Sequence, residues 1–227
     1  MKAVFFVLEI IGIIAFAWSG AIVARKKEMD IFGMCVMGVT TALGGGLIRD
    51  VILKRTPTAL TTPLYALIAA CVALFAFFPF VQKMIEHTRV FNTILLVSDS
   101  LGLGIFTVIG INACLEANPD ASIYMCVVMG VITGVGGGAL RDIFCNQMPS
   151  IFTKRFYACA SIMGAVACAL LHAYTNEILS TVVAIMLVLT LRILAAIFHW
   201  ELPKARSFYF DTTKSSTEPS QQSPTAQ

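Results

Sequence analysis

Seven long apolar runs, separated by short polar junctions, constrain this chain more than any other feature of its sequence. They cover about residues 3–24, 31–53, 63–82, 93–115, 121–145, 156–174 and 177–199. An α-helix of about 20 apolar residues is long enough to cross the hydrocarbon core of a bilayer. Only 13% of the residues are charged, against about a quarter in a soluble domain. The sequence therefore predicts an all-α integral membrane protein with seven transmembrane helices.

The distribution of Lys and Arg predicts how these helices are oriented, because cytoplasmic loops carry the excess of basic residues. The junctions at 24–30, 83–92 and 146–155 and the C-terminal tail hold ten basic residues, whereas the opposite face holds three. We therefore expect a multi-pass protein of the inner or plasma membrane, with its N-terminus outside and its C-terminus in the cytoplasm. Residues 201–227 are polar and are expected to form a disordered cytoplasmic tail.

A segment that occurs twice predicts an internal duplication. Residues 36–57 and 128–149 are identical at 11 of 22 positions, and both contain Gly-Gly-Gly-x-x-Arg-Asp. Chance would give about one or two identities. Each copy, at 1–91 and 92–175, would hold three helices, and a seventh helix at 176–200 lies outside the duplication. Because three is odd, the second copy is inverted in the membrane, an arrangement typical of transporters and channels.

The two glycine triplets predict an irregular backbone in the second helix of each copy. Glycine inside a helix costs roughly 1 kcal/mol relative to alanine, so we expect a kink or a local break there. Such backbone is tolerated at membrane depth where it lines a wet cavity, although close helix packing is an alternative. With inverted copies, the triplets would flank the midplane as a pair of gates. The expected pore-lining residues are Gly44, Gly45, Gly46, Gly136, Gly137 and Gly138.

Charged residues within the predicted spans are the other candidate site residues, because a buried charge is costly unless it is paired or meets water. They are Glu9, Arg49, Asp50, Asp99, Arg141, Asp142 and Arg192. Neighbouring residues on a helix point about 100° apart, so we expect each arginine of the motif to pair with an acid from another helix, Glu9 or Asp99. Ion pairs between arginine and carboxylate that hold the helices together explain these charges as well as a role in permeation does. Without Arg192 the cluster carries a net charge of about −2, which favours a cation.

Other functional classes find little support in the sequence. A net charge of +3 is too small to indicate nucleic acid, and the seven cysteines form no CxxC pair. No motif of an intramembrane enzyme is present. We therefore expect no enzymatic activity, no cofactor, no metal site and no nucleic-acid partner. A channel and a carrier for a small zwitterion such as glycine both remain open, since both use inverted repeats and broken helices.

The doubled Gly-Gly-Gly-x-x-Arg-Asp motif and the acid in the first helix of each copy, Glu9 and Asp99, closely resemble the prokaryotic TRIC (trimeric intracellular cation) channels. Members of this family are also labelled glycine transporters. The resemblance extends over about residues 3–200. It implies a homotrimer in the membrane lipids, with a pore in each subunit for potassium and, less selectively, sodium. It also implies second and fifth helices kinked at the triplets. Glu9 departs from the aspartate expected there, and no Lys lies between Val90 and Pro119, so the lipid regulation of the animal channels is not implied.

Overall fold

The computed structural model describes residues 2–79, 81, 83, 88–153, 156–172, 174–198 and 200, which form helices joined by turns and contain no strand. The long helices are α1 (Lys2–Lys26), α2 (Ile31–Ile52), α4 (Pro63–Phe77), α6 (Thr88–Ala117), α7 (Ile123–Phe144), α9 (Tyr157–His172) and α10 (Glu177–Ile197). Two single-turn helices, α3 (Thr58–Thr61) and α8 (Ser150–Thr153), follow α2 and α7. The predicted all-α fold is confirmed, and each predicted apolar run coincides with a long helix. The predicted tail at 201–227 lies outside the described residues.

Five of the long helices, α1, α2, α6, α7 and α10, are long and apolar enough to cross a membrane. The apolar helices α4 and α9 have 15 and 16 residues. At 1.5 Å per residue they measure about 22–24 Å, which is less than a hydrocarbon core of about 30 Å. The count of seven spans therefore stays a prediction.

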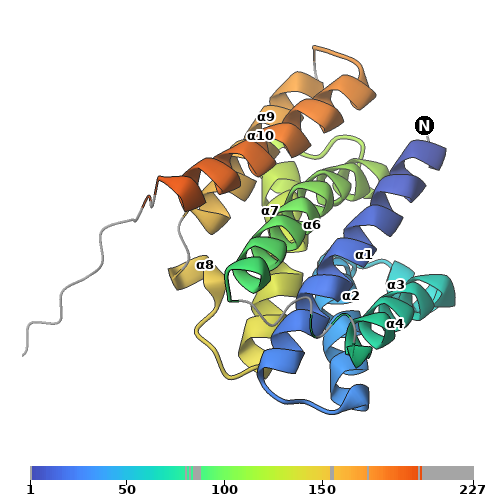
Figure 1. Ribbon diagram of the computed structural model, residues 1–227. Helices are drawn as coiled ribbons and strands as arrows, with labels where there is room; N and C mark the ends of the chain where they lie inside the picture. The colour runs from blue at the N-terminus through green and yellow to red at the C-terminus, as the bar shows by residue number, and fades with distance from the viewer. Residues whose placement is uncertain are drawn as a thin grey trace, which may run out of the picture.

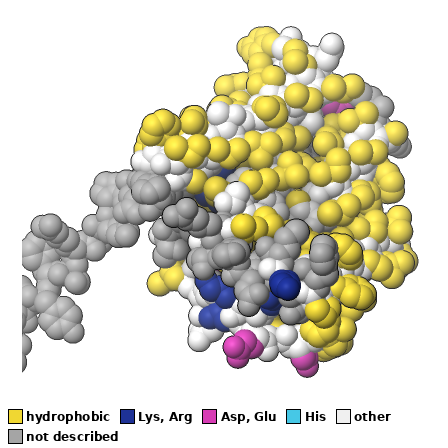
Figure 2. Space-filling view, in the orientation of Figure 1, with side chains coloured by type: hydrophobic (Ala, Val, Ile, Leu, Met, Phe, Trp, Pro, Cys, Tyr) yellow, Lys and Arg dark blue, Asp and Glu magenta, His cyan; other side chains and the backbone are white. Residues whose placement is uncertain are grey.

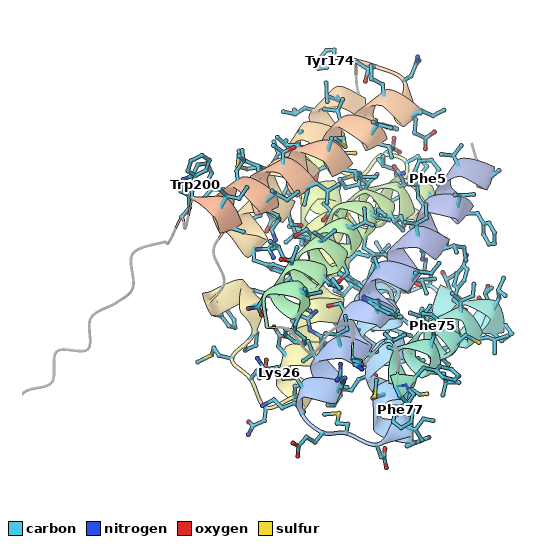
Figure 3. All side chains as sticks on the ribbon, in the orientation of Figure 1. Phe5, Lys26, Phe75, Phe77, Tyr174 and Trp200 are labelled. Atoms are coloured by element: carbon cyan, nitrogen blue, oxygen red, sulfur yellow. The ribbon has the colours of Figure 1, made fainter. Side chains whose placement is uncertain are left out.

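The surface matches a protein that is surrounded by lipid. Figure 2 shows a largely hydrophobic face on which most of the visible charged side chains gather toward one end. Lys26, at the C-terminal end of α1, lies toward that end, whereas Phe5, at the N-terminal end of the same helix, lies toward the other (Figure 3). The charged end is therefore the end at which α1 finishes.

The helices of the two copies pack in equivalent ways. α1 lies beside α6 and α2 packs against α7, while α4 packs against α1 and α2 as α9 packs against α6 and α7 (Figure 1). Equivalent helices run antiparallel where they meet: a Cβ added at Gly12 of α1 would lie 2.9 Å from Ile105 of α6, and one added at Gly102 of α6 would overlap Phe16 of α1. Antiparallel contact between equivalent helices is what inverted repeats produce. α10 packs against α6 and α9, outside this symmetric arrangement.

The first and second helices of each copy are held together by the same contact. A Cβ added at Gly20 of α1 would lie 2.5 Å from Oγ1 of Thr41, and one added at Gly110 of α6 would lie 2.5 Å from Oγ1 of Thr133. Neither distance is possible for a real side chain, so only glycine allows the helices to pack this closely. The duplication read from the sequence is thus repeated in the packing.

Candidate functional site

α2 and α7 cross at the two glycine triplets, where their backbones touch. A Cβ added at Gly45 would overlap the carbonyl oxygen of Thr133, and one added at Gly137 would overlap that of Thr41. A Cβ added at Gly136 would lie 3.1 Å from the Cα atom of Gly45. A side chain at the middle position of either triplet would therefore push the two helices apart. The triplets act here as a packing device of the small-residue kind.

The triplets differ from the expectation in two respects. Both α2 and α7 continue as α-helices through residues 44–46 and 136–138, and no described glycine has a positive φ. The predicted local break is absent, because these glycines allow two helices to pack closely and do not interrupt either helix. The triplets also meet at a single crossing, so they do not form two separate gates on either side of the midplane.

A kink within the continuous helices stays a prediction. Thr41 donates its hydroxyl hydrogen bond to the Met37 carbonyl oxygen at 2.7 Å, and Thr133 donates to the Met129 carbonyl oxygen at 2.6 Å. Hydrogen bonds of this type, from a hydroxyl to the carbonyl four residues earlier, often bend a helix. They occur one turn before each triplet and therefore favour a bend at equivalent places in α2 and α7.

The arginine of each motif lies along the third glycine of the triplet, three residues earlier in the helix. A Cβ added at Gly46 would lie 3.6 Å from Nη2 of Arg49, and one added at Gly138 would lie 3.6 Å from Nη2 of Arg141. Residues three apart share a helix face, and long side chains on a helix point back toward its N-terminus. The spacing of the motif thus lays a guanidinium group along a glycine. Both arginines are buried, with side chains 4% and 0% exposed.

The aspartate of each motif fixes the turn that follows the helix. Asp50 Oδ2 accepts a hydrogen bond from the backbone N–H of Thr58 at 2.9 Å, and Asp142 Oδ2 accepts one from the backbone N–H of Ser150 at 2.7 Å. Thr58 and Ser150 are the first residues of α3 and α8. Each aspartate therefore satisfies an N–H group at a helix start that has no partner within that helix. This supports a structural role for both aspartates.

Each arginine also pairs with the aspartate that follows it, contrary to our expectation from helix geometry. Arg49 Nε lies 2.8 Å from Asp50 Oδ1, and Arg141 Nη2 lies 2.9 Å from Asp142 Oδ1. The two side chains leave the helix in different directions, but the long arginine side chain reaches around to the carboxylate. The aspartate is already held in place by the next turn, so the arginine can adapt to it.

An acid from another helix takes part in the second cluster, as predicted. Arg141 Nη1 lies 2.7 Å from Asp99 Oδ1 of α6 and also donates a hydrogen bond to Ser19 of α1. In the first copy, Glu9 instead accepts a hydrogen bond from Tyr65 Oη at 2.7 Å. Among the described residues no ion pair joins Arg49 to Glu9 or to Asp99, so the expectation of an acid from another helix is wrong for Arg49. Tyr65 binds Glu9, while Asp50 holds the arginine.

A further arginine joins the Asp99 cluster from α10. Arg192 is 3% exposed, and its Nη2 lies 3.7 Å from Asp99 Oδ2. Its Nε donates a hydrogen bond to Ser100 Oγ at 3.3 Å, and its Cζ lies 4.6 Å from the centroid of the Tyr157 ring. The seventh long helix therefore contributes directly to the charged cluster of the second copy.

The charge count that favoured a cation is wrong once all members are included. In the first copy, Arg55 Nε lies 2.7 Å from Asp50 Oδ1. Arg55 and Arg192 raise the number of arginines to two in each cluster, against two acids in each, so the formal charge of both clusters is zero. Arg55 was missed because it follows the apolar run, and Arg192 was left out because it lies outside the duplication. Selectivity therefore does not follow from net charge.

Aromatic rings fill the centre between the two copies. Phe16 of α1 and Phe106 of α6 stack with their ring centroids 5.2 Å apart and an interplanar angle of 27°. They are 1% and 5% exposed. Phe16 also faces α7, since a Cβ added at Gly137 would lie 3.3 Å from its ring. This pair of buried aromatic rings thus lies beside the glycine crossing, between the two charged clusters.

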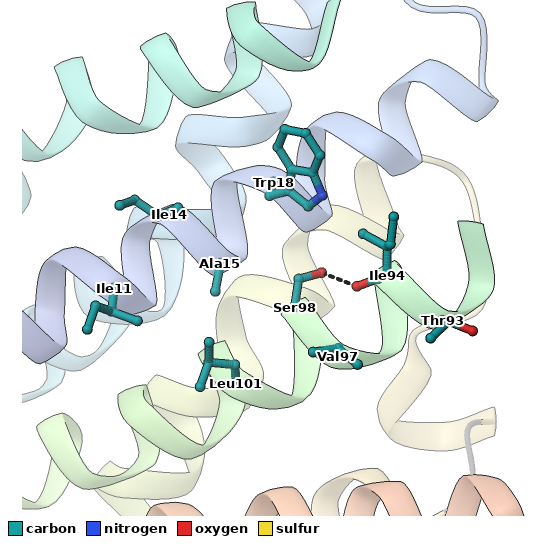
Figure 4. Close-up of a pocket in the computed structure, with 9 residues that line it drawn as sticks. All are labelled: Ile11, Ile14, Ala15, Trp18, Thr93, Ile94, Val97, Ser98 and Leu101. Atoms are coloured by element: carbon teal, nitrogen blue, oxygen red, sulfur yellow. Dashed lines mark hydrogen bonds between the residues drawn. The ribbon is translucent and has the colours of Figure 1, made fainter. Parts of the chain in front are cut away.

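An apolar groove of about 440 Å³ runs between α1 and α6 (Figure 4). Ile11, Trp18 and Leu101 are among its lining residues. The hydroxyl of Ser98, a polar lining residue, donates its hydrogen bond to the carbonyl oxygen of Ile94 at 2.7 Å. Since no charged residue lines the groove, it does not suit an ion.

Comparisons with known proteins place this geometry in a family. A family model described as "Glycine transporter" matches residues 6–80 and 96–173. A solved structure that describes conductance through TRIC cation channels is 36% identical, with a TM-score of 0.78, and the match covers 89% of this chain and 98% of that one. This chain belongs to the TRIC channel family. The TRIC channel orthologue of Rhodobacter sphaeroides is 33% identical, with a TM-score of 0.79, and the match covers 86% of this chain and 98% of that one.

A curated relative supports a membrane location. The UPF0126 inner membrane protein YadS of Escherichia coli (strain K12) is 37% identical over 204 residues, which is 90% of this chain and 96% of the relative. Together with the five helices of membrane-spanning length, this identifies a membrane protein. The solved TRIC relatives are ion channels and not enzymes. The resemblance that the doubled motif predicted is therefore confirmed.

Sequence reasoning missed the roles of two tyrosines at this TRIC-family site. Tyr65 and Tyr157 occupy equivalent positions near the start of α4 and α9, and both are buried. Tyr65 binds Glu9, and Tyr157 lies under Arg192. The available signal was a polar side chain repeated at the duplication offset inside an otherwise apolar run.

Proposed function

We propose that this protein is a channel for monovalent cations, mainly potassium, with a conduction path inside each subunit of a homotrimer. The observation that carries the proposal is the pair of buried charged clusters on opposite sides of the α2–α7 crossing, in a chain 36% identical to a solved TRIC cation channel. Because α2 and α7 are antiparallel where they cross, Arg49 and Arg141 lie on opposite sides of the crossing. Ionisable groups at membrane depth typically mark an ion pathway.

The proposed path follows the interface between the two copies, where permeation sites of inverted repeats lie. It would lead from the Arg49–Asp50 cluster past the glycine crossing to the Arg141–Asp99 cluster. The stacked rings of Phe16 and Phe106 close its centre, so conduction would require these rings to separate or turn. Potassium, and less readily sodium, would be selected by individual carboxylate oxygens along the path, since the clusters are formally neutral.

Further parts of the proposal rest on the sequence and on the relatives. The excess of Lys and Arg at the end where α1 finishes supports a cytoplasmic C-terminus and an external N-terminus. The trimeric state is that of the TRIC channels, and membrane lipids would surround the trimer. We also propose that 1–91 and 92–175 are two inverted units, with 176–200 and the tail at 201–227 outside them. Since α6 begins at Thr88, the boundary between the units belongs a few residues earlier.

Purified protein in sealed vesicles tests this function. We expect a potassium gradient to drive a potassium flux that depends on the protein and that rises with concentration without early saturation. Choline in place of potassium serves as the control and should pass poorly. Saturable glycine counterflow without a potassium flux would contradict the channel and support a carrier.

A further inference from the structure

The two copies hold their equivalent tyrosines in different ways. In the first copy, Tyr65 Oη donates a hydrogen bond to Glu9 Oε2 at 2.7 Å. In the second copy, Tyr157 is 1% exposed, and its Oη has no hydrogen-bond partner among the described residues. Asp99 occupies the position equivalent to Glu9, but its side chain is one methylene shorter. Among the described residues, the direct bond between carboxylate and tyrosine hydroxyl is therefore seen in the first copy and not in the second.

Arg192 of α10 makes an alternative connection in the second copy. Its Cζ lies 4.6 Å from the ring centroid of Tyr157 in α9, and its Nη2 lies 3.7 Å from Asp99 Oδ2 in α6. Its Nε also donates a hydrogen bond to Ser100 Oγ at 3.3 Å. A guanidinium over an aromatic face is attracted to the ring, and more strongly when the pair is desolvated. Arg192 is 3% exposed, so one side chain joins α6 to α9 away from solvent.

This connection reaches the crossing of α2 and α7 through Asp99. Asp99 Oδ1 lies 2.7 Å from Arg141 Nη1. The guanidinium of Arg141 lies along Gly138, since a Cβ added there would be 3.6 Å from Nη2. A displacement of Arg192 would therefore remove its ion pair with Asp99, the acid that holds Arg141 beside the crossing.

We infer that Arg192 is a positioning residue: by stacking on Tyr157 and pairing with Asp99, it replaces the carboxylate–tyrosine hydrogen bond of the first copy. It thereby holds the second charged cluster in place. α10 lies outside the duplication, yet it supplies the contact that the shorter acid of the second copy lacks. The inference follows from the packing, and only its readout by ion flux rests on the proposed function.

Restoring the missing methylene gives a direct test. We expect Arg192→Gln to lower potassium flux per folded protein about fivefold, a factor typical of coupling between contacting residues. We expect Asp99→Glu to extend the carboxylate toward Tyr157 Oη, so Arg192→Gln added to Asp99→Glu should change the flux by less than about twofold. Tyr157→Phe, added to this double variant, should abolish the rescue because the glutamate then has no hydroxyl to bind.

Arg55→Gln is the matched control, since Arg55 pairs with an acid of the first copy. Asp99→Glu should not rescue it. The inference is overturned if Arg192→Gln conducts like the wild type, if Asp99→Glu does not rescue it, or if the rescue survives Tyr157→Phe. If Arg192→Gln does not fold, the yield of folded protein replaces flux as the readout, with the same pattern expected. If the wild type carries no potassium, the proposed function fails, while melting temperatures of these variants still decide the inference.

Discussion

Adjacent glycines of one triplet should respond in opposite ways to the same substitution. At Gly45 an added Cβ would overlap the backbone carbonyl oxygen of Thr133, which belongs to the facing helix and cannot rotate away. At Gly46 the nearest atom is Nη2 of Arg49 at 3.6 Å, an ordinary contact with the end of a flexible side chain. We therefore expect Gly45→Ala to destabilise the fold and Gly46→Ala to be tolerated.

The size of the difference follows from two effects. Alanine is favoured over glycine inside a helix by about 1 kcal/mol, and this gain is common to both variants. Overpacking a tight contact costs about 1–3 kcal/mol, and this cost applies only at Gly45. The two variants should then differ by about 1–3 kcal/mol, because the helix-propensity gain cancels. Gly46→Ala itself should match or slightly exceed the wild type in stability.

Melting temperatures of the wild type and both variants in the same detergent would measure this difference. Gly137→Ala and Gly138→Ala repeat the experiment in the second copy, with one qualification: a Cβ at Gly138 would lie 2.7 Å from Tyr157 Oη, so this site should be less tolerant than Gly46. Equal melting temperatures for Gly45→Ala and Gly46→Ala would refute the assignment of the α2–α7 contact to the middle glycine.

Two further comparisons test the charged clusters. Asp99→Asn removes one member of a buried ion pair and should lower the free energy of unfolding by about 3–5 kcal/mol. Adding Arg141→Gln should recover part of that loss, whereas adding Arg49→Gln should not. Melting temperatures of the single and double variants measure this, and simple additivity with Arg141→Gln would rule out their pairing. Tyr65→Phe removes a hydrogen bond to a carboxylate and should lower the free energy of unfolding by about 1.5–3 kcal/mol. Tyr157→Phe removes a hydroxyl that has no hydrogen-bond partner among the described residues, so it should leave the stability nearly unchanged. Equal losses from the two tyrosine variants would contradict the difference between the copies.

The helices and the duplication could be predicted from the sequence because both depend on local patterns. Apolar runs of membrane length place the helices, and the repeated motif at 36–57 and 128–149 identifies the two copies. Inversion followed from the odd number of helices in each copy. It agrees with the antiparallel contacts of Gly12 with Ile105 and of Gly102 with Phe16.

The separate roles of the three glycines could not be predicted from the sequence. Glycine weakens a helix wherever it occurs, so the triplet by itself favours a break. The outcome depends on what lies opposite: the backbone of Thr133 faces Gly45, while the arginine side chain of the same helix lies along Gly46. Contacts between segments far apart in the chain decide whether a glycine triplet breaks its helix or lets it pack closely against another helix. These contacts cannot be read from a single sequence.

The charge balance was misjudged for a related reason. Counting charges within the motif and its copy left out Arg55, which lies beyond the apolar run, and Arg192, which lies outside the duplication. Both reach acids through the tertiary fold. Net charge therefore does not explain the proposed cation selectivity, which electrophysiology can measure directly.

Single-channel recording in a planar bilayer with asymmetric potassium chloride tests the central claim most directly. We expect discrete current steps whose reversal potential lies close to the equilibrium potential of potassium. A reversal potential near that of chloride would contradict cation selection. The absence of current steps from protein that carries out saturable glycine exchange would contradict the channel itself.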